Sequence, residues 1–287
     1  MDTPEETVEQ TAVEQAKGVR KIAVIGAGNI GEALIAGLID ADVDPKTITA
    51  TNRSAQHSDE LAARYQVHTE TDNREAVQEA EAVFLCVKPA QIGEVLEEIG
   101  EVVEGNDVAT VLVSMAAGVT LSAMEAAVPT AGAPLVRVMP NTPMLVGKGV
   151  FAVSWGRYVT EEQRRVVRCL LASAGEVVEV AEAKMDAVTA ISGSGPAYYF
   201  LFTEALIDAG VSLGLSRDLA TQLATSTAEG AGVMLSGPVS PAQLRAAVSS
   251  PAGTTVRAIR ELEESGLRGA VYRATEACAA RSAELGL

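Results

Sequence analysis

Residues 21–31 read KIAVIGAGNIG, and the apolar segment EALIAGLIDA follows at residues 32–41. A buried strand, a G-x-G-x-x-G turn and a helix in this order predict a βα unit whose loop binds a pyrophosphate. Gly26 permits the tight turn, Gly28 lets the backbone approach the ligand, and Gly31 permits close helix packing. The helix N-terminus adds free N–H groups and a positive dipole end. The alternative is a glycine-rich turn with a structural role only.

Beyond this loop, short β-rich runs alternate with helical patterns as far as about Val180. The runs are KIAVIG (21–26), TITAT (47–51), AVFLCV (82–87), VATVLVS (108–114), PLVRVM (134–139), GVFAVS (149–154) and EVVEV (176–180). This alternation predicts a mostly parallel sheet covered by helices. From about Ala181 the strand signals stop, and four or five helices rich in Ala and Gly are expected. We predict an α/β protein with an acidic tail at 1–19, a doubly wound domain at 20–180 and an all-helical domain at 181–287.

The composition excludes several classes of function. The net charge of −16 opposes binding to nucleic acid and to anionic membranes, which both carry negative charge. Only two histidines and three widely spaced cysteines are present, so no metal site and no His-Ser triad with a downstream serine is expected. No apolar stretch is long enough for a membrane span, and the N-terminus is acidic rather than basic. We expect a cytoplasmic protein, and the acidic, lysine-poor surface suggests a halophilic source, with an acidic mesophile as the alternative.

The end of the second predicted strand indicates which dinucleotide is preferred. An NAD-binding domain carries an acidic residue here, about 20 residues beyond the last loop glycine, to bind the ribose 2′-hydroxyl. This chain has Asn52, Arg53 and Ser54 instead. A guanidinium can hold a 2′-phosphate through charge-assisted hydrogen bonds, so NADPH is favoured, with NADH bound more weakly. The alternative for Arg53 is an ordinary surface arginine.

Two further strands end in segments that should line the same crevice. AVFLCV ends at Lys88-Pro89, and VATVLVS leads into Met115-Ala116-Ala117. In an open α/β sheet, ligands lie beyond the carboxyl ends of the strands, so both segments are expected at the cofactor. The alternative for Lys88 is an ordinary charge at a strand end.

In the helical part, residues 249–255 read SSPAGTT and precede an apolar stripe at helical spacing. Pro251 is expected in the first helical turn with a serine before it as the cap. Small side chains leave the backbone N–H groups of that turn open to a carboxylate, and Thr255 adds a hydroxyl. Plain helix capping is the equally weighted alternative. The segment SGSGPAY (192–198) has a similar pattern, for which a capped, closely packed helix start is the favoured interpretation.

Taken together, IGAGNIG, VKPAQ, RVMPNTP, MDAVTAISGSGPAY and VSSPAGTT resemble the pyrroline-5-carboxylate reductase family, in order, over about residues 20–285. The resemblance implies an N-terminal Rossmann-type domain and a C-terminal helical dimerisation domain, in a homo-oligomer that is at least a dimer and in some relatives a larger ring such as a decamer. It also implies NADPH-dependent reduction of the cyclic imine 1-pyrroline-5-carboxylate to L-proline. Ala252 departs from the family, which usually has glycine there, and its methyl group would lie at the carboxylate pocket.

By position, the resemblance assigns site residues. Thr255 would be catalytic, facing the imine nitrogen, and the substrate would be bound by Ser250, Gly253, Thr254 and Thr255. The cofactor would be bound by Ile25, Gly26, Ala27, Gly28, Asn29, Ile30, Asn52, Arg53, Ser54, Asn73, Cys86, Val87, Lys88, Pro89, Met115, Ala116, Ala117 and Pro196. Both helix openings, at Gly28 and at Pro251, are expected to present their amides to one shared space.

Two alternatives remain at this point. A reductase of the β-hydroxyacid dehydrogenase type would use a lysine between the domains, and Lys184 is the only lysine near that junction. A non-catalytic NADPH-binding regulator would need no site for an imine, whereas the chain carries an intact SSPAGTT segment. Oxidation of NADPH on addition of pyrroline-5-carboxylate distinguishes these alternatives from the reductase.

Overall fold

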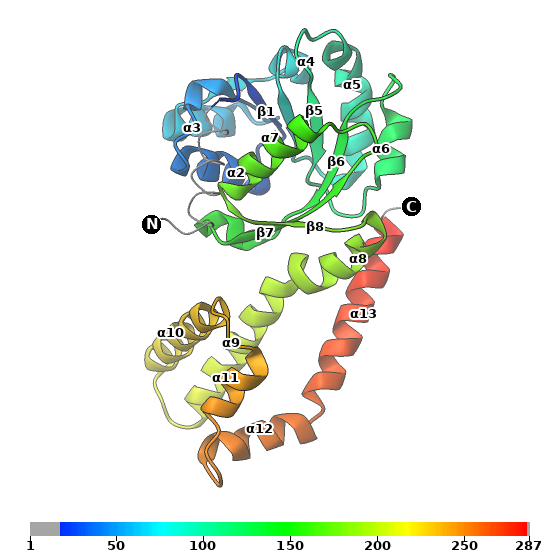
Figure 1. Ribbon diagram of the computed structural model, residues 1–287. Helices are drawn as coiled ribbons and strands as arrows, with labels where there is room; N and C mark the ends of the chain where they lie inside the picture. Colours follow the sequence, from blue (N-terminus) through cyan, green and yellow to red (C-terminus); the bar gives the residue numbers. More distant parts are fainter. Residues whose placement is uncertain (1–17, 286–287) are drawn as a thin grey trace, which may run out of the picture. The chain divides into compact units, whose positions relative to one another are not determined.

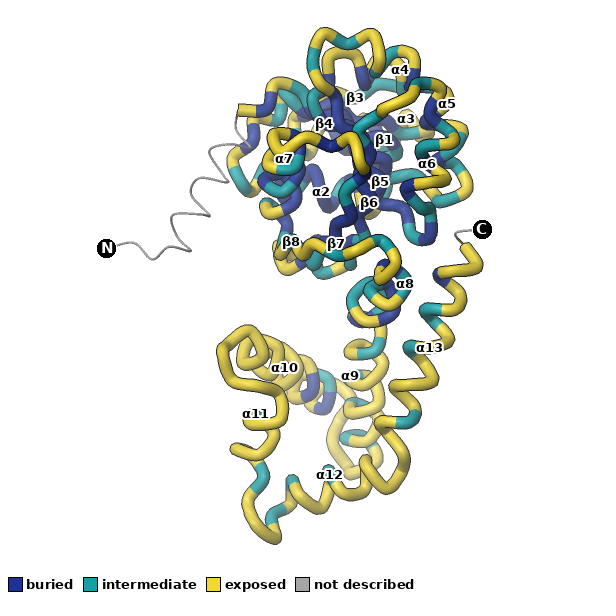
Figure 2. Tube along the Cα trace, turned by 45° about the vertical axis from the view of Figure 1, so that its right-hand side comes forward, coloured by how far each residue is buried: buried dark blue, intermediate teal, exposed yellow. Residues whose placement is uncertain are grey.

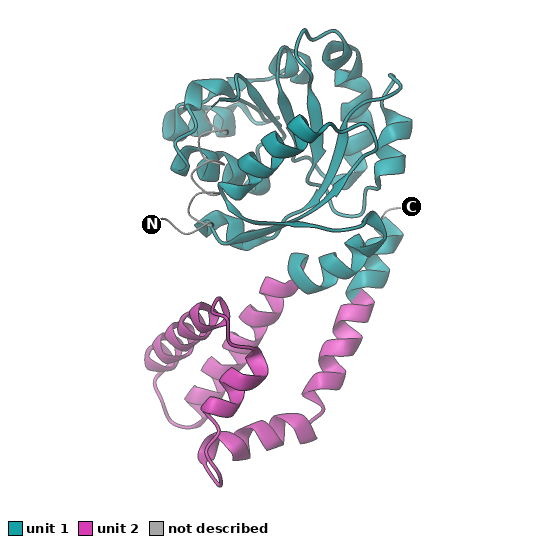
Figure 3. Cartoon of the chain, viewed as in Figure 1, with its two compact units in different colours: residues 1–193, 278–287 teal, residues 194–277 magenta. Residues whose placement is uncertain are grey.

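The computed structural model describes residues 18–285, which form two compact units (Figures 1 and 3). Unit 1 comprises residues 1–193 and 278–287, and unit 2 comprises residues 194–277. The division therefore falls at Gly193, while the domain boundary at residue 180 stays a prediction. Most of the predicted tail at 1–19 lies outside the described residues.

Unit 1 contains a sheet with the strand order β3-β2-β1-β4-β5-β6-β7-β8. Neighbouring strands pair in parallel except β6 and β7, which pair antiparallel, so the predicted mostly parallel sheet is confirmed. The strands are β1 (Ile22–Ile25), β2 (Ile48–Thr51), β3 (His68–Glu70), β4 (Ala82–Leu85), β5 (Val111–Ser114), β6 (Leu135–Met139), β7 (Gly149–Trp155) and β8 (Gly175–Glu179). Each predicted run contains a strand. Strand β3 was not predicted, because this partly exposed edge strand of three residues is too short to carry a detectable pattern.

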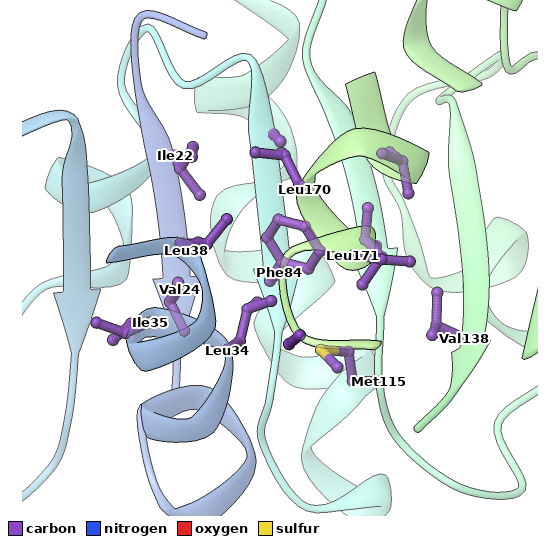
Figure 4. Packing of buried hydrophobic residues seen from close by; sticks show 14 of the residues in the cluster. Ile22, Val24, Leu34, Ile35, Leu38, Phe84, Met115, Val138, Leu170 and Leu171 are labelled. Atoms are coloured by element: carbon purple, nitrogen blue, oxygen red, sulfur yellow. The ribbon is translucent and has the colours of Figure 1, made fainter. Parts of the chain in front are cut away.

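Helices cover both faces of this sheet because successive strand residues point to opposite sides. Ile22 and Val24 pack on the face covered by α2, α3 and α7, as Figure 4 shows for α2 and α7. Ala23 and Ile25 pack on the other face, against α4, α5 and α6. The helices are α2 (Asn29–Asp40), α3 (Ala55–Tyr65), α4 (Asn73–Val77), α5 (Ile92–Glu104), α6 (Leu121–Ala127) and α7 (Glu161–Ala172). Short 3₁₀ turns lie at Pro45–Thr47, Pro89–Gln91, Thr142–Val146 and Glu182–Lys184.

The strand order creates the position of a ligand crevice. After β1 the chain crosses through α2 to β2 on one side, whereas β4, on the other side of β1, continues through α5 to β5. The connections therefore diverge between β1 and β4, and in such sheets the carboxyl ends of these strands border a crevice. The fold class predicted from the sequence is the one observed.

The remaining residues are helical, as predicted. The segment from residue 185 contains α8 (Met185–Val188), a π-helical turn (Thr189–Gly193) and α9 (Gly195–Ser212). It is followed by α10 (Arg217–Leu235), α11 (Pro241–Ala247), α12 (Thr254–Glu264) and α13 (Leu267–Leu285). The helices of unit 2 are exposed along most of their length (Figure 2). Among the described residues, no helix is both long enough and apolar enough to cross a membrane.

Candidate functional site

A cleft of about 700 Å³ lies in unit 1 at the carboxyl ends of the parallel strands. It is lined by the residues that follow β1, β2, β3, β4, β5 and β6, and by the start of α5. Of the predicted cofactor residues, the lining contains Ile25, Gly26, Gly28, Asn29, Ile30, Asn52, Arg53, Asn73, Cys86, Val87, Lys88, Pro89, Met115, Ala116 and Ala117. The structure thus brings together, in one cleft, segments as far apart in the sequence as Ile25 and Thr142.

Some positions differ from the predicted set. Ala27 and Ser54 do not line the cleft, and Pro196 belongs to unit 2. The lining also contains Thr51, Thr71, Gln91, Val95 and Thr142, which the sequence analysis did not select. Thr51, Thr71 and Thr142 lie at or just beyond strand ends, which is a signal that could have identified them. Gln91 ends the VKPAQ segment and is the N-cap of α5, whereas Val95 lies within α5, where no motif marks it.

The glycines of the loop meet three different physical requirements. Gly26 has a φ of +79°, and a β-carbon there would lie 2.5 Å from Val87 Cγ1, so the tight turn excludes a side chain. A β-carbon at Gly28 would meet no atom within 4 Å, so this residue faces open space into which a ligand can approach. A β-carbon at Gly31 would lie 3.0 Å from Val24 Cγ1, where α2 packs on β1. These properties fit a loop that binds a dinucleotide pyrophosphate.

The glycine loop is tied to the end of β2. The N–H groups of Gly26 and Ala27 both donate to the carbonyl oxygen of Thr51, at 3.1 and 2.8 Å. Asn52 Nδ2 donates to Ala27 O at 2.9 Å, and Asn52 Oδ1 accepts from Ser54 N at 2.9 Å. The side chain of Asn52 is therefore used to organise the loop, a role that the sequence analysis did not foresee.

Arg53 lines the cleft, and the next residue, Ser54, immediately precedes α3. Ser54 is the N-cap of α3, and its hydroxyl accepts from His57 N at 3.3 Å. Arg53 is exposed and, within residues 18–285, has no hydrogen bond or ion pair. A cation without a carboxylate partner beside a helix N-terminus suits an additional phosphate.

A chain of side-chain hydrogen bonds orients Asn73. Thr51 Oγ1 accepts from Gly26 N at 3.2 Å and donates to Asn73 Oδ1 at 2.8 Å. Asn73 Nδ2 donates to Glu98 Oε2 at 2.8 Å. Because both ends of the amide are engaged, Asn73 is held in one orientation at the cleft wall, where it lies at the start of α4.

The opposite part of the cleft, formed by residues after β4 and β5, is mostly apolar. Cys86 Sγ donates to Met115 Sδ at 3.7 Å, and burial raises the pKa of the Cys86 thiol to about 12. Cys86 is therefore a neutral thiol near pH 7 and adds no charge to this surface. Lys88 is exposed at the end of the same segment and provides a cation at the cleft.

The SSPAGTT segment folds differently from the expected cap. Gly253 N donates to Ser250 O at 2.9 Å, and Ala252 has a φ of +58°, which together are typical of a type II turn centred on Pro251 and Ala252. Helix α12 begins at Thr254 with Gly253 as its N-cap, so Pro251 in the first helical turn and a capping serine were both wrong predictions. Because glycine offers no capping side chain, the first amides of α12 have no side-chain cap from this residue.

The SGSGPAY segment also differs from its prediction. A π-helical turn at Thr189–Gly193 precedes α9, and Ser194 makes no side-chain cap, so the capped helix start was wrong. The close packing was correct, since a β-carbon at Gly193 would lie 2.4 Å from Met139 Cε. Asn141 Nδ2 donates to Ser192 O at 3.2 Å, which ties this turn to the segment after β6. Such π-turns are frequent at functional sites.

Comparison with known proteins agrees with this architecture. Residues 182–285 match the family model for the pyrroline-5-carboxylate reductase dimerisation domain. Residues 21–118 match the model described as NADP oxidoreductase, coenzyme F420-dependent. The two matches cover the helical part and the first part of unit 1, respectively.

Individual relatives cover nearly the whole chain. Pyrroline-5-carboxylate reductase of Corynebacterium melassecola is 59% identical over 266 residues, which are 92% of this chain and 98% of that protein. The solved structure of a pyrroline-5-carboxylate reductase from Coxiella burnetii has a TM-score of 0.88 at 36% identity, covering 94% of this chain and 99% of that one. The Plasmodium falciparum pyrroline carboxylate reductase, solved with NADP bound, has a TM-score of 0.83 at 31% identity, with coverages of 94% and 99%. This chain therefore belongs to the pyrroline-5-carboxylate reductase family.

Proposed function

We propose that this protein reduces the cyclic imine 1-pyrroline-5-carboxylate to L-proline with NADPH, the last step of proline biosynthesis. The observation that carries the proposal is the 59% identity to a pyrroline-5-carboxylate reductase across 98% of that relative. The cleft adds independent support, since its glycine loop and strand ends have the chemistry that a dinucleotide requires.

The residues of the cleft fit NADPH. Open space at Gly28 receives the pyrophosphate, and the unpaired guanidinium of Arg53 beside the N-terminus of α3 receives the 2′-phosphate. Asn73 would hold the ribose, and the apolar residues of the cleft after β4 and β5 would hold the nicotinamide. Pro196 would contact the nicotinamide ring. We expect NADH, which lacks the 2′-phosphate, to bind more weakly.

The substrate is assigned to the start of α12. Its carboxylate binds against the turn of Ser250 and Gly253 and accepts a hydrogen bond from the amide of Thr254, since a helix N-terminus favours an anion and Gly253 N already donates to Ser250 O. Thr255 is the second residue of the helix, and its hydroxyl forms a hydrogen bond to the imine nitrogen. Bound NADPH supplies the hydride that the electrophilic carbon of the imine accepts. The chain holds the reactants in place, Thr255 assists protonation of the nitrogen, and solvent is the ultimate source of the proton.

The decisive experiment follows oxidation of the reduced nicotinamide by its absorbance, with purified protein, both cofactors, and five- and six-membered cyclic imines. We expect rapid oxidation of NADPH with pyrroline-5-carboxylate, slower oxidation of NADH, and formation of proline. Binding of NADPH without oxidation would reject the enzyme in favour of a regulator. Oxidation with a β-hydroxyacid dehydrogenase product, but none with the imine, would favour the other reductase class.

We further propose that the protein is a homo-oligomer, at least a dimer, and that dimers assemble into a decamer. The match of residues 182–285 to a dimerisation domain supports association of identical chains. The exposure of Tyr199, Phe200 and Leu201 on α9, each about two-thirds exposed in the single chain, supports a surface that another copy covers.

We propose that the enzyme is cytoplasmic. We also propose a halophilic source, since a net charge of −16 keeps a protein hydrated where salt screens repulsion. Activity measured across a KCl series should rise towards molar salt. A steady fall over that range would contradict halophilic adaptation and leave the acidic composition as a mesophilic feature.

A further inference from the structure

His57 contacts the glycine loop although no motif marks it. It lies in the first turn of α3, and its Nε2 is 2.9 Å from the carbonyl oxygen of Ala27. Because a carbonyl oxygen only accepts hydrogen bonds, Nε2 carries the proton and donates. The chain's other histidine, His68, is exposed on β3 and does not line the cleft.

The carbonyl of Ala27 is held by two donors. Asn52 Nδ2 and His57 Nε2 each donate to it at 2.9 Å, and the residue itself is fully buried. Gly28 N, in the same peptide plane, donates to Gly26 O at 2.7 Å. Since a peptide plane is rigid, fixing Ala27 O sets the direction in which the chain passes through Gly28 to Asn29, the first residue of α2.

Both donors to Ala27 O, Asn52 and His57, lie close to Arg53 in the sequence. Asn52 also accepts from Ser54 N, so one side chain links the loop to the N-terminus of α3. The charged group that faces the imidazole is Glu60, whose Oε2 lies 3.6 Å from Nδ1. His57 is thus placed to set the glycine loop at a fixed distance from the first turn of α3.

We propose that His57 is a positioning residue of the nucleotide site, which keeps the glycine loop in its pyrophosphate-binding conformation by donating to Ala27 O. Loss of this donor lowers the fraction of molecules with a competent loop, and apparent affinity falls with that fraction. The pyrophosphate is common to NADPH and NADH, so both lose affinity by the same factor. This inference depends on the proposed function in one respect, which is that the nucleotides bound are NADPH and NADH.

The test measures the Kd of NADPH and of NADH directly, by nicotinamide fluorescence, in the full chain without imine. His57→Phe keeps a ring but removes the donor, and both Kd values should rise about three- to tenfold, as for loss of one hydrogen bond. His57→Gln retains an N–H at a similar reach and should restore both Kd values to within about twofold. Should His57→Phe fail to fold, His57→Ala serves in its place, since alanine favours the helix.

Two matched controls complete the design. His68→Phe removes the other histidine and should leave both Kd values unchanged. Arg53→Ala should raise the Kd of NADPH far more than that of NADH, because only NADPH carries the 2′-phosphate. The contrast between an equal effect at His57 and an unequal effect at Arg53 separates loop positioning from recognition of the additional phosphate.

Specific results would overturn the proposal. Unchanged Kd values in folded His57→Phe, even with a lower melting temperature, would reduce His57 to a structural contact of α3. If His57→Phe raised the Kd of NADPH alone, His57 would act at the 2′-phosphate and not on the glycine loop. If His57→Gln bound both nucleotides as weakly as His57→Phe, the hydrogen bond to Ala27 O would not explain the loss of affinity. If the wild-type protein bound neither nucleotide, the proposed function itself would fail, which is a separate outcome.

Discussion

At the scale of single residues, Ala252 shows how one side chain conflicts with the backbone around it. Its φ of +58° lies in the left-handed region, at the position of a type II turn that usually holds glycine. The alanine that replaces the family's usual glycine here therefore acts mainly through backbone strain, because Ala252 is exposed. A left-handed residue with a β-carbon is strained by about 1–2 kcal/mol.

The change Ala252→Gly should therefore stabilise the protein. Relief of that strain exceeds the extra backbone entropy that glycine brings to the unfolded chain, about 0.4–1 kcal/mol. We expect the free energy of unfolding to increase by about 0.5 kcal/mol, the difference between these terms. Urea unfolding at one fixed protein concentration measures this change, and a clear decrease in stability would contradict the left-handed geometry.

Thr255 is the residue that, in the proposed reaction, assists protonation of the imine nitrogen. Replacement by alanine should lower turnover about a hundredfold or less, because one positioned hydroxyl is lost while the hydride donor remains. Thr255→Ser keeps the hydroxyl and is the matched control, expected to retain most of the turnover. Steady-state kinetics at saturating NADPH provide the measurement. A Thr255→Ala enzyme with unchanged turnover and unchanged KM for the imine would remove Thr255 from the site.

At the scale of elements, two polar contacts within unit 1 fix the segment that leads out of the sheet domain. The buried Arg137 on β6 forms an ion pair with Glu182 at 3.2 Å, and Glu182 Oε1 also accepts from Leu121 N at the start of α6. Asn141 accepts from Val150 N of β7 at 2.8 Å and donates to Ser192 O in the π-helical turn. The residues after β6 therefore hold the chain just before α9 begins.

Asn141→Ala should destabilise unit 1. The substitution removes an acceptor from Val150 N and a donor from Ser192 O, which are both partly buried. A fully buried group left unpaired costs about 1–3 kcal/mol, so a loss at the lower end of this range is expected. Asn141→Asp keeps the acceptor and loses the donor, so a smaller loss is expected. Thermal unfolding followed by circular dichroism ranks the three proteins. Equal melting temperatures for all of them would show that Asn141 does not anchor the turn.

At the scale of the whole molecule, the two units differ in how far they bury their apolar residues. Unit 1 has a continuous core on both faces of its sheet. Among the described residues of unit 2, the buried apolar side chains are only Ala220 and Ala224. Large apolar side chains on α9, α10 and α13 remain exposed. Figure 2 colours most of these helices yellow, as exposed. In the proposed homo-oligomer, other copies would cover these faces and so stabilise a unit with so little core.

The change Phe200→Asp should therefore break the oligomer. Phe200 is 66% exposed in the single chain, and a charge placed there is buried without a partner when a second copy covers α9. We expect a monomer by light scattering coupled to size-exclusion chromatography, with reduced helical circular dichroism. Val146→Asp, at a position of unit 1 that is at least as exposed, is the control and should keep the native mass. An unchanged oligomer in Phe200→Asp would exclude α9 from the interface.

Much of the fold could be predicted from the sequence because its signals are local. β-rich runs, helical periodicity and the glycine loop are properties of neighbouring residues, and all seven predicted runs became strands. The short edge strand β3 was missed because three partly exposed residues carry no pattern. The starts of α9 and α12 were mispredicted because Ser and Pro before a helix allow both a cap and a turn, and the local sequence does not choose between them.

The sequence alone determined that a dinucleotide loop begins an α/β domain, that a helical domain follows, and that the second strand is followed by an arginine instead of an acid. Tertiary structure decided which strand ends share one cleft, that Asn52 and His57 both hold Ala27, and that Gly253 begins α12. The physical reason is distance along the chain. Propensity and periodicity act over a few residues, whereas a hydrogen bond between residues thirty positions apart exists only once packing has brought its two groups together.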